Sequence, residues 1–157
     1  MLGYWNKKED TKKVLKDGWL YTGDIGEIDP EDGYLKITDR KKDIIVSAGG
    51  DNISPAKIEN QLSNSPAIDQ SMVYGDGKNY LVAIIVPTKD FKGQKEKISE
   101  IIHEVNKNLT LIEKVKKFHL IDENFSIENG LLTPTMKVKR NQVIVRYKNI
   151  LENFYKK

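Results

Sequence analysis

The sequence predicts an α+β fold in which one small sheet is flanked by helices. Predicted strands and helices are intermixed along the 157 residues, without an internal repeat. An almost wholly apolar segment at 80–86 predicts a central strand that is covered on both faces. Apolar side chains at helical spacing over 98–109 and 143–154 predict two amphipathic helices that pack around this sheet.

The composition is that of a soluble globular chain, with 38% apolar and 31% charged residues. The net charge is +3, and basic residues are interleaved with acidic ones, which argues against a nucleic-acid partner. There is no cysteine, and His103 and His119 lie far apart, so we expect no disulfide and no metal site. No secretory signal or membrane span is recognised, so we expect a cytoplasmic protein. Peripheral contact with a membrane is compatible with the sequence.

The first forty residues are expected to be rich in strands after a polar helix over 1–16. Leu35 and Ile37 alternate with polar residues, so one face of the third strand is expected to be buried. The charged run Arg40-Lys41-Lys42-Asp43 cannot be core and marks a boundary between domains. The predicted strands of this part cover 19–21, 25–28 and 34–38.

The remainder of the chain is predicted to form the α+β domain itself. Its clearest start signal is at Ser54 and Pro55, because serine caps helix N-termini and proline suits the first helical position. Ile53 and Ile58 have the spacing of a hydrophobic staple across this start. Further strands are predicted at 44–46, 68–74, 80–86 and 118–121, and helices at 55–62, 98–109, 111–115 and 143–154.

Three short segments carry the functional signal. They are Tyr21-Thr22-Gly23-Asp24, Ile37-Thr38-Asp39-Arg40 with the lysines that follow, and Thr133-Pro134-Thr135-Met136-Lys137-Val138-Lys139-Arg140. Together they resemble the C-terminal signatures of the AMP-forming adenylating enzymes, the superfamily of acyl-CoA synthetases and luciferases. Within that superfamily the chain is most similar to the long-chain fatty acid–CoA ligases.

This resemblance implies a division of the chain. Residues 1–40 would be the tail of a larger N-terminal AMP-binding domain, residues 41–43 a hinge, and residues 44–157 a mobile C-terminal lid domain. The implied reaction converts a fatty acid and ATP to acyl-AMP and pyrophosphate, and then transfers the acyl group to CoA. Because the resemblance covers only the last quarter of such a ligase, the chain by itself is expected to be inactive.

The resemblance also implies roles for individual residues. Asp24 and Arg40 would contact the ribose of the nucleotide, and a carboxylate suits a vicinal diol because it accepts several hydrogen bonds. Lys42 occupies the position on which the lid pivots, where some members carry aspartate. Gly49 and Gly50 would approach the pantetheine arm of CoA, although two glycines here are equally explained by a β-turn.

Lys137 aligns with the catalytic lysine of the family. Many members place this lysine in a Ser-Gly-Lys context, whereas the long-chain branch has a Leu-Thr-Pro-Thr-x-Lys form like this one. Pro134 fixes its own φ and favours an extended Thr133, so we expect Lys137 on a presented loop. Lys139 is a competing candidate two residues further on, and the position after Thr-Pro-Thr favours Lys137.

The substrates and cofactors implied by the resemblance are ATP or AMP, CoA, a fatty acid and Mg²⁺. The metal would be bound mainly by the N-terminal domain, which is the implied protein partner of the lid. Two alternatives stay open. One is a stand-alone nucleotide- or CoA-binding or regulatory module that has the lid fold, and the other is an aryl or short-chain acid ligase of the same superfamily.

Overall fold

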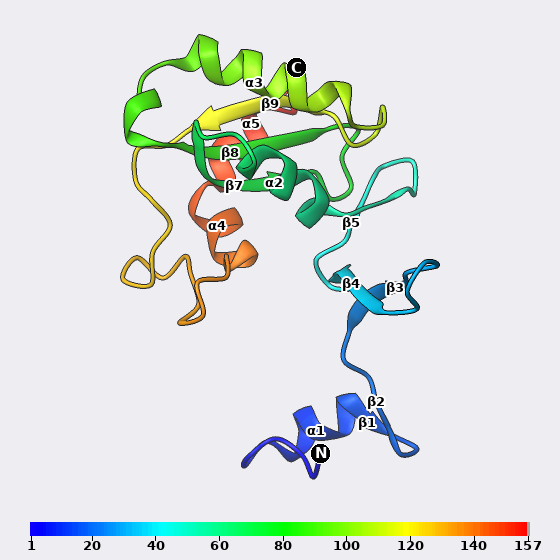
Figure 1. The fold of residues 1–157 in the computed structure, drawn as a ribbon. Coiled ribbons are helices and arrows are strands. Elements are labelled where there is room, and N and C mark those ends of the chain that lie inside the picture. The colour runs from blue at the N-terminus through cyan, green and yellow to red at the C-terminus, as the bar shows by residue number, and fades with distance from the viewer. Residues whose placement is uncertain (157) are drawn as a thin grey trace. The chain divides into compact units, whose positions relative to one another are not determined.

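The computed structural model describes residues 1–156, which divide into two compact units (Figure 1). The first unit is Met1–Lys42, and the second begins at Asp43. Helices and strands are intermixed along the chain, which confirms the predicted α+β class. Among the described residues, no helix is both long enough and apolar enough to cross a bilayer.

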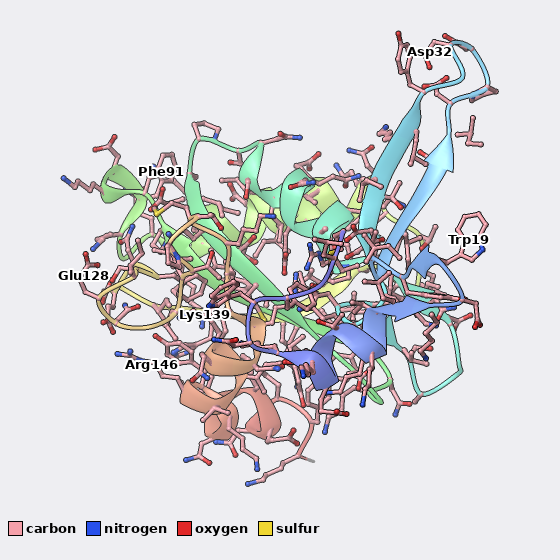
Figure 2. All side chains as sticks on the ribbon, turned by 90° about the horizontal axis from the view of Figure 1, so that it is seen from below. Trp19, Asp32, Phe91, Glu128, Lys139 and Arg146 are labelled. Atoms are coloured by element: carbon pink, nitrogen blue, oxygen red, sulfur yellow. The ribbon has the colours of Figure 1, made fainter. Side chains whose placement is uncertain are left out.

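The first unit consists of one short helix and two antiparallel ribbons. Helix α1 has no buried residue and is shorter than the helix predicted over 1–16, which is therefore wrong in its extent. Strand β1 pairs with β2, and β3 pairs with β4. Figure 2 shows Asp32 at the turn between β3 and β4. The elements are α1 (Lys8–Val14), β1 (Leu15–Lys16), β2 (Trp19–Leu20), β3 (Asp24–Ile28) and β4 (Leu35–Arg40).

The prediction of a buried apolar face on β4 is wrong. Leu35 is 67% exposed and Ile37 is 56% exposed. The strands alternate in side-chain polarity as expected, but a two-stranded ribbon has no second layer that could cover its apolar face. Trp19 is exposed as well, and its ring projects from the ribbon in Figure 2. The first unit therefore presents several large apolar side chains at its surface.

The second unit is built on a three-stranded sheet in the order β7-β8-β9. Strands β7 and β8 are antiparallel, whereas β8 and β9 are parallel and are joined through α3. Every residue of β8 is buried, so the predicted central strand is confirmed. Its elements are β5 (Ile45–Val46), β6 (Asn52–Ile53), α2 (Pro55–Ser63), β7 (Ile68–Tyr74), β8 (Leu81–Pro87), η1 (Lys89–Phe91), α3 (Lys95–Lys107), β9 (Val115–Leu120), α4 (Arg140–Arg146) and α5 (Lys148–Asn153).

The two faces of the sheet hold separate apolar cores. We call the first core the one beneath α2 and α3, and the second core the one beneath α4, α5 and the loop that precedes them. In Figure 1 these helices lie on opposite faces of the sheet. Strand β8 supplies both cores because successive side chains of a strand point to opposite faces. Leu81, Ala83 and Ile85 belong to the first core, and Val82, Ile84 and Val86 belong to the second.

Helix α2 begins as the sequence predicts. The Ser54 hydroxyl accepts a hydrogen bond from the Lys57 N–H at 3.3 Å, and Pro55 is the first helical residue. Ile53 and Ile58 are both buried in the first core. These signals are local in the sequence, so no distant contact is needed to place the start of the helix.

The helix predicted over 111–115 is wrong, because those residues form a turn that leads into β9. The carboxylate of Glu113 folds back to accept hydrogen bonds from the N–H and hydroxyl of Thr110. The side chain of Asn106 forms two hydrogen bonds with the backbone of Val115, one to its N–H and one to its carbonyl, each of 2.9 Å. These side-chain contacts compete with helical hydrogen bonds and fix the first residue of β9.

The helix predicted over 143–154 is interrupted at Tyr147, where the backbone has φ −105° and ψ 17°. Helices α4 and α5 meet at this residue, and each contributes a fully buried side chain to the second core. These side chains are Val143 and Leu151. The apolar stripe was therefore predicted correctly, whereas the continuity of the helix was not.

Tyrosines attach the end of the described chain to the sheet. The Tyr155 hydroxyl donates to the backbone carbonyls of Tyr74 at 3.3 Å and Tyr80 at 3.0 Å. The Tyr74 hydroxyl donates to the Glu152 carboxylate at 2.9 Å. Burial, together with this carboxylate, raises the pKa of Tyr74 to about 12, and burial also raises the pKa of Tyr155.

These shifts predict that the second unit loses stability in alkali. A tyrosine in the unfolded chain releases its proton near pH 10, whereas folded Tyr74 holds it to about pH 12. The stabilisation is therefore fully present below pH 10 and disappears as the pH rises to about 12. Urea unfolding on both sides of this window should show the decline, and Tyr74→Phe should reduce it. An equal decline in Tyr74→Phe would contradict the assignment.

Candidate functional site

The first unit brings together the two residues predicted to bind the nucleotide ribose. Asp24 and Arg40 are direct partners in the register of β3 and β4, and Arg40 Nε lies 3.1 Å from Asp24 Oδ1. The Arg40 side chain is 51% exposed and the Asp24 side chain 25% exposed. A carboxylate can accept about four hydrogen bonds, so Asp24 can bind a further ligand without losing Arg40.

Hydrogen bonds fix the backbone next to both Asp24 and Arg40. The Thr22 hydroxyl accepts from the Asp24 N–H at 3.1 Å, and the Gly23 carbonyl accepts from the Lys41 N–H at 2.8 Å. Asp39, to which the sequence analysis gave no role, is only 9% exposed and accepts from the Arg40 N–H at 2.6 Å. Asp39 therefore positions the backbone from which the Arg40 side chain extends.

Lys42 lies in an exposed turn between β4 and β5. It is also the last residue of the first unit. Backbone outside regular structure can change its φ and ψ angles at little cost, as a hinge requires. The hinge at 41–43 and the pivot at Lys42 stay predictions.

The loop that contains Gly49 and Gly50 is a tight turn held by one serine. The Ser47 hydroxyl accepts from the N–H groups of Gly49 and Asp51, each at 3.1 Å, and donates to the Asp51 carboxylate at 3.0 Å. Gly50 has φ +88°, a left-handed conformation that favours glycine. Turn geometry therefore accounts for Gly50 without any ligand.

A pocket of about 200 Å³ opens beside this loop, within the second unit. It combines the polar loop with the turn between β7 and β8, and the Lys78 carbonyl accepts from the Ala48 N–H at 3.0 Å. Of the two predicted CoA-proximal glycines, Gly49 lines this pocket. Its lining is Ser47, Gly49, Asp51, Ile53, Lys78, Asn79, Tyr80, Leu81 and Ile112.

Lys137 is exposed and is the last residue of a hydrogen-bonded turn that begins at Thr133, so it lies on a presented loop as predicted. We call residues 133–137 the lysine turn. The Thr133 N–H donates to the Lys137 carbonyl at 2.8 Å, and the Lys137 N–H donates to the Thr133 hydroxyl at 3.0 Å. A β-bridge between Leu132 and Val138 closes the base of the turn. Between residues 1 and 156, no ion pair involves the Lys137 side chain.

Lys139 differs from Lys137 in its backbone position. Its carbonyl accepts from the Gln142 and Val143 N–H groups, so it is the residue from which α4 begins. Figure 2 shows Lys139 where the preceding loop enters this helix. Lys137 therefore belongs to the turn and Lys139 to the helix start. The choice of Lys137 as the catalytic residue stays a prediction.

The residue before Lys137 adopts a backbone conformation that explains the Ser-Gly-Lys context. Met136 has φ +61°, in the left-handed region that glycine occupies without strain. A glycine before the lysine is thus suited to this turn. Here methionine takes the same conformation, and its side chain is exposed.

An ion pair that was not predicted from the sequence joins Glu59 to Arg140, which lies close in the chain to the lysine turn that ends at Lys137. Arg140 Nη2 contacts Glu59 Oε2, and both side chains are only 18% exposed. The two residues are 81 positions apart, and no spacing within a single element indicates their contact.

The described residues can also be compared with the ligand groups that hold metal ions. Within residues 1–156 no group of three or more His, Asp or Glu side chains is arranged to hold a metal ion. We assign none of the described residues to Mg²⁺.

Comparisons with known proteins agree on the family. The model of the AMP-binding enzyme C-terminal domain matches residues 42–157. The long-chain-fatty-acid–CoA ligase FadD15 of Mycobacterium tuberculosis is 38% identical, over 99% of this chain and 29% of its own length. The mouse long-chain-fatty-acid–CoA ligase 5 is 39% identical, over 98% of this chain and 26% of its own length. This chain thus spans less than a third of either relative.

A solved structure shares the fold. The A domain of carboxylic acid reductase from Segniliparus rugosus, in complex with AMP and a carboxylic acid, superposes with a TM-score of 0.87. It is 28% identical, and the match covers 98% of this chain and 26% of that chain.

The conformation of Met136 predicts the effect of two substitutions. Met136→Gly should leave the free energy of unfolding unchanged or raise it by up to about 1 kcal/mol, because relief of left-handed strain offsets the greater flexibility of glycine. Met136→Val should lower it by about 1 kcal/mol or more, since a β-branched residue tolerates this conformation poorly. Urea unfolding of the 157-residue chain measures both. A stabilising valine would contradict the assigned backbone.

Proposed function

The chain belongs to the AMP-binding enzyme C-terminal domain family, and we propose that it is the C-terminal part of a long-chain fatty acid–CoA ligase. The 38–39% identity to two such ligases supports the substrate class. The observation that carries the mechanism is the exposed Lys137 on a closed turn of a unit separate from the Asp24–Arg40 pair. The ligase activity belongs to the complete enzyme.

The first half-reaction joins two anions. A carboxylate oxygen of the fatty acid attacks the α-phosphorus of ATP, which forms acyl-AMP and releases pyrophosphate. Repulsion between one pair of charges at ~4 Å is about 1 kcal/mol in water and several-fold more in a drier site. The Lys137 ammonium group, placed between the carboxylate and the α-phosphate, offsets this repulsion and stabilises the charge that develops.

Asp24 and Arg40 have the ribose of the nucleotide as their proposed ligand. The Asp24 carboxylate accepts hydrogen bonds from the ribose hydroxyls while Arg40 holds it in place. The AMP complex of the related A domain supports a nucleotide ligand for this fold. Since the ribose is present in both ATP and acyl-AMP, this contact serves both half-reactions.

In the second half-reaction the Lys137 ammonium group has to be away from the reacting carbonyl. The CoA thiol releases its proton and its sulfur attacks the acyl carbonyl. The thioester C–S bond forms, the C–O bond to the phosphate breaks, and AMP leaves. Lys137 would obstruct the thiol, so we propose that the second unit rotates at Lys42 between the two steps. The rotated unit would present Gly49, Gly50 and the pocket beside them to the pantetheine arm. Gly49 lines that pocket beside the polar residues Ser47 and Asp51, which supports this role.

Lys137→Ala in the complete ligase tests the proposed function. Adenylation should fall about 10²- to 10³-fold, because the developing charge loses its cation. Thioester formation from supplied acyl-adenylate should stay within about two-fold, since Lys137 has left the site by then. Pyrophosphate release and acyl-CoA formation are measured separately.

Lys139→Ala is the matched control for this variant. This control removes an ammonium group of the same kind from Lys139, two residues after Lys137 and at the start of α4. Adenylation in this control should change by less than about three-fold. Equal losses in both half-reactions of Lys137→Ala, or a greater loss in Lys139→Ala, would refute the role of Lys137.

Asp24→Asn should affect both half-reactions, in contrast to Lys137→Ala. The ribose loses a charged acceptor, for which a loss of about 10- to 100-fold in ATP affinity is expected. Asp32→Asn, in the turn between β3 and β4, removes an equal charge from the same ribbon and should have no effect. Unaltered ATP affinity in Asp24→Asn would exclude the ribose contact.

A further inference from the structure

We propose that Glu59 and Arg140 are positioning residues for Lys137, which they hold by clamping the lysine turn to the edge of the sheet. This inference rests on the proposed function, because it takes Lys137 as the catalytic cation. Neither residue is expected to touch a substrate. They act by fixing the position of the lysine turn of residues 133–137, which ends at Lys137.

The clamp closes around one residue of β7. Val73 N–H donates to Glu59 Oε1 at 2.7 Å, and the Val73 carbonyl accepts from Arg140 Nη1 at 3.3 Å. Arg140 Nη2 and Glu59 Oε2 then contact each other. Both polar groups of the Val73 backbone are therefore satisfied by a pair of side chains that are themselves joined.

The position of β7 explains why this contact is available. Strand β7 is at the edge of the three-stranded sheet and has β8 on one side only. Residues along an antiparallel edge strand alternately direct their backbone groups toward the neighbouring strand and away from it. Val73 directs both groups outward, where Glu59 and Arg140 take the place of a missing strand.

The clamp joins elements from opposite faces of the sheet. Glu59 lies on α2, which covers the first core, and Arg140 is the first residue of α4, which covers the second. A planar guanidinium forms several hydrogen bonds in a fixed geometry, so it transmits position better than a lysine would. With both side chains 18% exposed, removal of either breaks an ion pair that is largely desolvated.

Arg140 is separated from Lys137 by only two residues, and the intervening backbone is constrained. The Lys139 N–H donates to the Leu131 carbonyl at 2.8 Å, and Leu132 is bridged to Val138. Leu131 and Leu132 are buried in the second core. The turn is therefore anchored at its apolar base and at Arg140, and a shift of α4 would displace the lysine. A misplacement of 1 Å can reduce a rate by about 10²-fold.

A second ion pair on α4 provides a matched control. Arg146 Nη2 lies 2.6 Å from Glu123 Oε2, and the two side chains are 40% and 52% exposed. Arg146 is on the same helix as Arg140, and Figure 2 shows it further along α4 than Lys139. Arg146→Met removes an arginine–carboxylate pair from α4 without touching the clamp.

The variants are Arg140→Met, Glu59→Gln and Arg140→Lys. In the complete ligase, Arg140→Met should lower kcat for adenylation about 10- to 100-fold, with KM for ATP within about two-fold. Thioester formation from supplied acyl-adenylate should stay within about two-fold. Glu59→Gln should act in the same direction but more weakly, because its amide oxygen still accepts from Val73.

Rescue distinguishes positioning from a merely structural role. Arg140→Lys keeps a cationic donor for the Val73 carbonyl, so it should recover part of the adenylation lost in Arg140→Met. The recovery should be incomplete, because one ammonium cannot reproduce the guanidinium geometry toward both Val73 and Glu59. Amide hydrogen exchange of residues 133–139 in the 157-residue chain should be faster in Arg140→Met and unaltered in Arg146→Met.

Each alternative result has a defined meaning. Equal losses in both half-reactions, an unchanged kcat, or the same kcat loss in Arg146→Met would overturn the positioning role. If Arg140→Met does not fold, the milder Glu59→Gln decides by the same criteria. Lys137→Ala in parallel separates the two hypotheses. A severe adenylation loss in Lys137→Ala with normal clamp variants rejects the clamp alone, whereas normal adenylation in Lys137→Ala rejects the proposed function.

Discussion

The buried strand β8 supplies both apolar cores of the second unit, and the placement of its other elements depends on this strand. Three of its side chains, Leu81, Ala83 and Ile85, belong to one core. The side chains between and after them, Val82, Ile84 and Val86, belong to the other. The helices on the two faces therefore pack into separate apolar cores, with the sheet between them. A functional turn on one face can be fixed relative to the other face only through the sheet or around its edge. The Glu59–Arg140 pair goes around the edge.

The chemistry proposed for this chain places opposite demands on a single lysine. The ammonium group has to be exposed so that it can meet anions, yet its backbone has to be rigid. The turn satisfies both, since its hydrogen bonds close on Thr133 while the side chain of Lys137 extends into solvent. The proposed nucleotide residues belong to a different unit and are already paired with each other. Separate units for cation and nucleotide are what a two-step reaction with one mobile cation requires.

Features encoded by neighbouring residues could be predicted from the sequence. The start of α2 needs only Ser54 and Pro55, and the burial of β8 follows from its unbroken apolar run. The exposed lysine turn follows from a proline and two threonines. The exposure of Leu35 could not be predicted in this way, because burial depends on a covering layer that alternation alone does not specify. The break at Tyr147 lies within a correct apolar stripe, since periodicity indicates a face but not helical continuity.

In the candidate site, too, the contacts that could not be predicted are those between residues far apart in the sequence. The pairing of Asp24 with Arg40 needed the register of β3 and β4, which is set by a turn and a bulge between Ile25 and Gly26. The contact between Glu59 and Arg140 spans 81 positions and depends on three elements coming together. Its members are ordinary charged residues of two helices when read alone. Only the folded sheet edge shows that they meet at Val73.

The capped edge of β7 also has a consequence for association between molecules. An open edge strand exposes unpaired N–H and carbonyl groups to which the strand of another chain can add. At Val73 these groups are occupied by side chains of the same molecule, and the charges of Glu59 and Arg140 occupy the space that an incoming strand would need. The pair thus blocks the addition of a strand at this point on the β7 edge of the sheet.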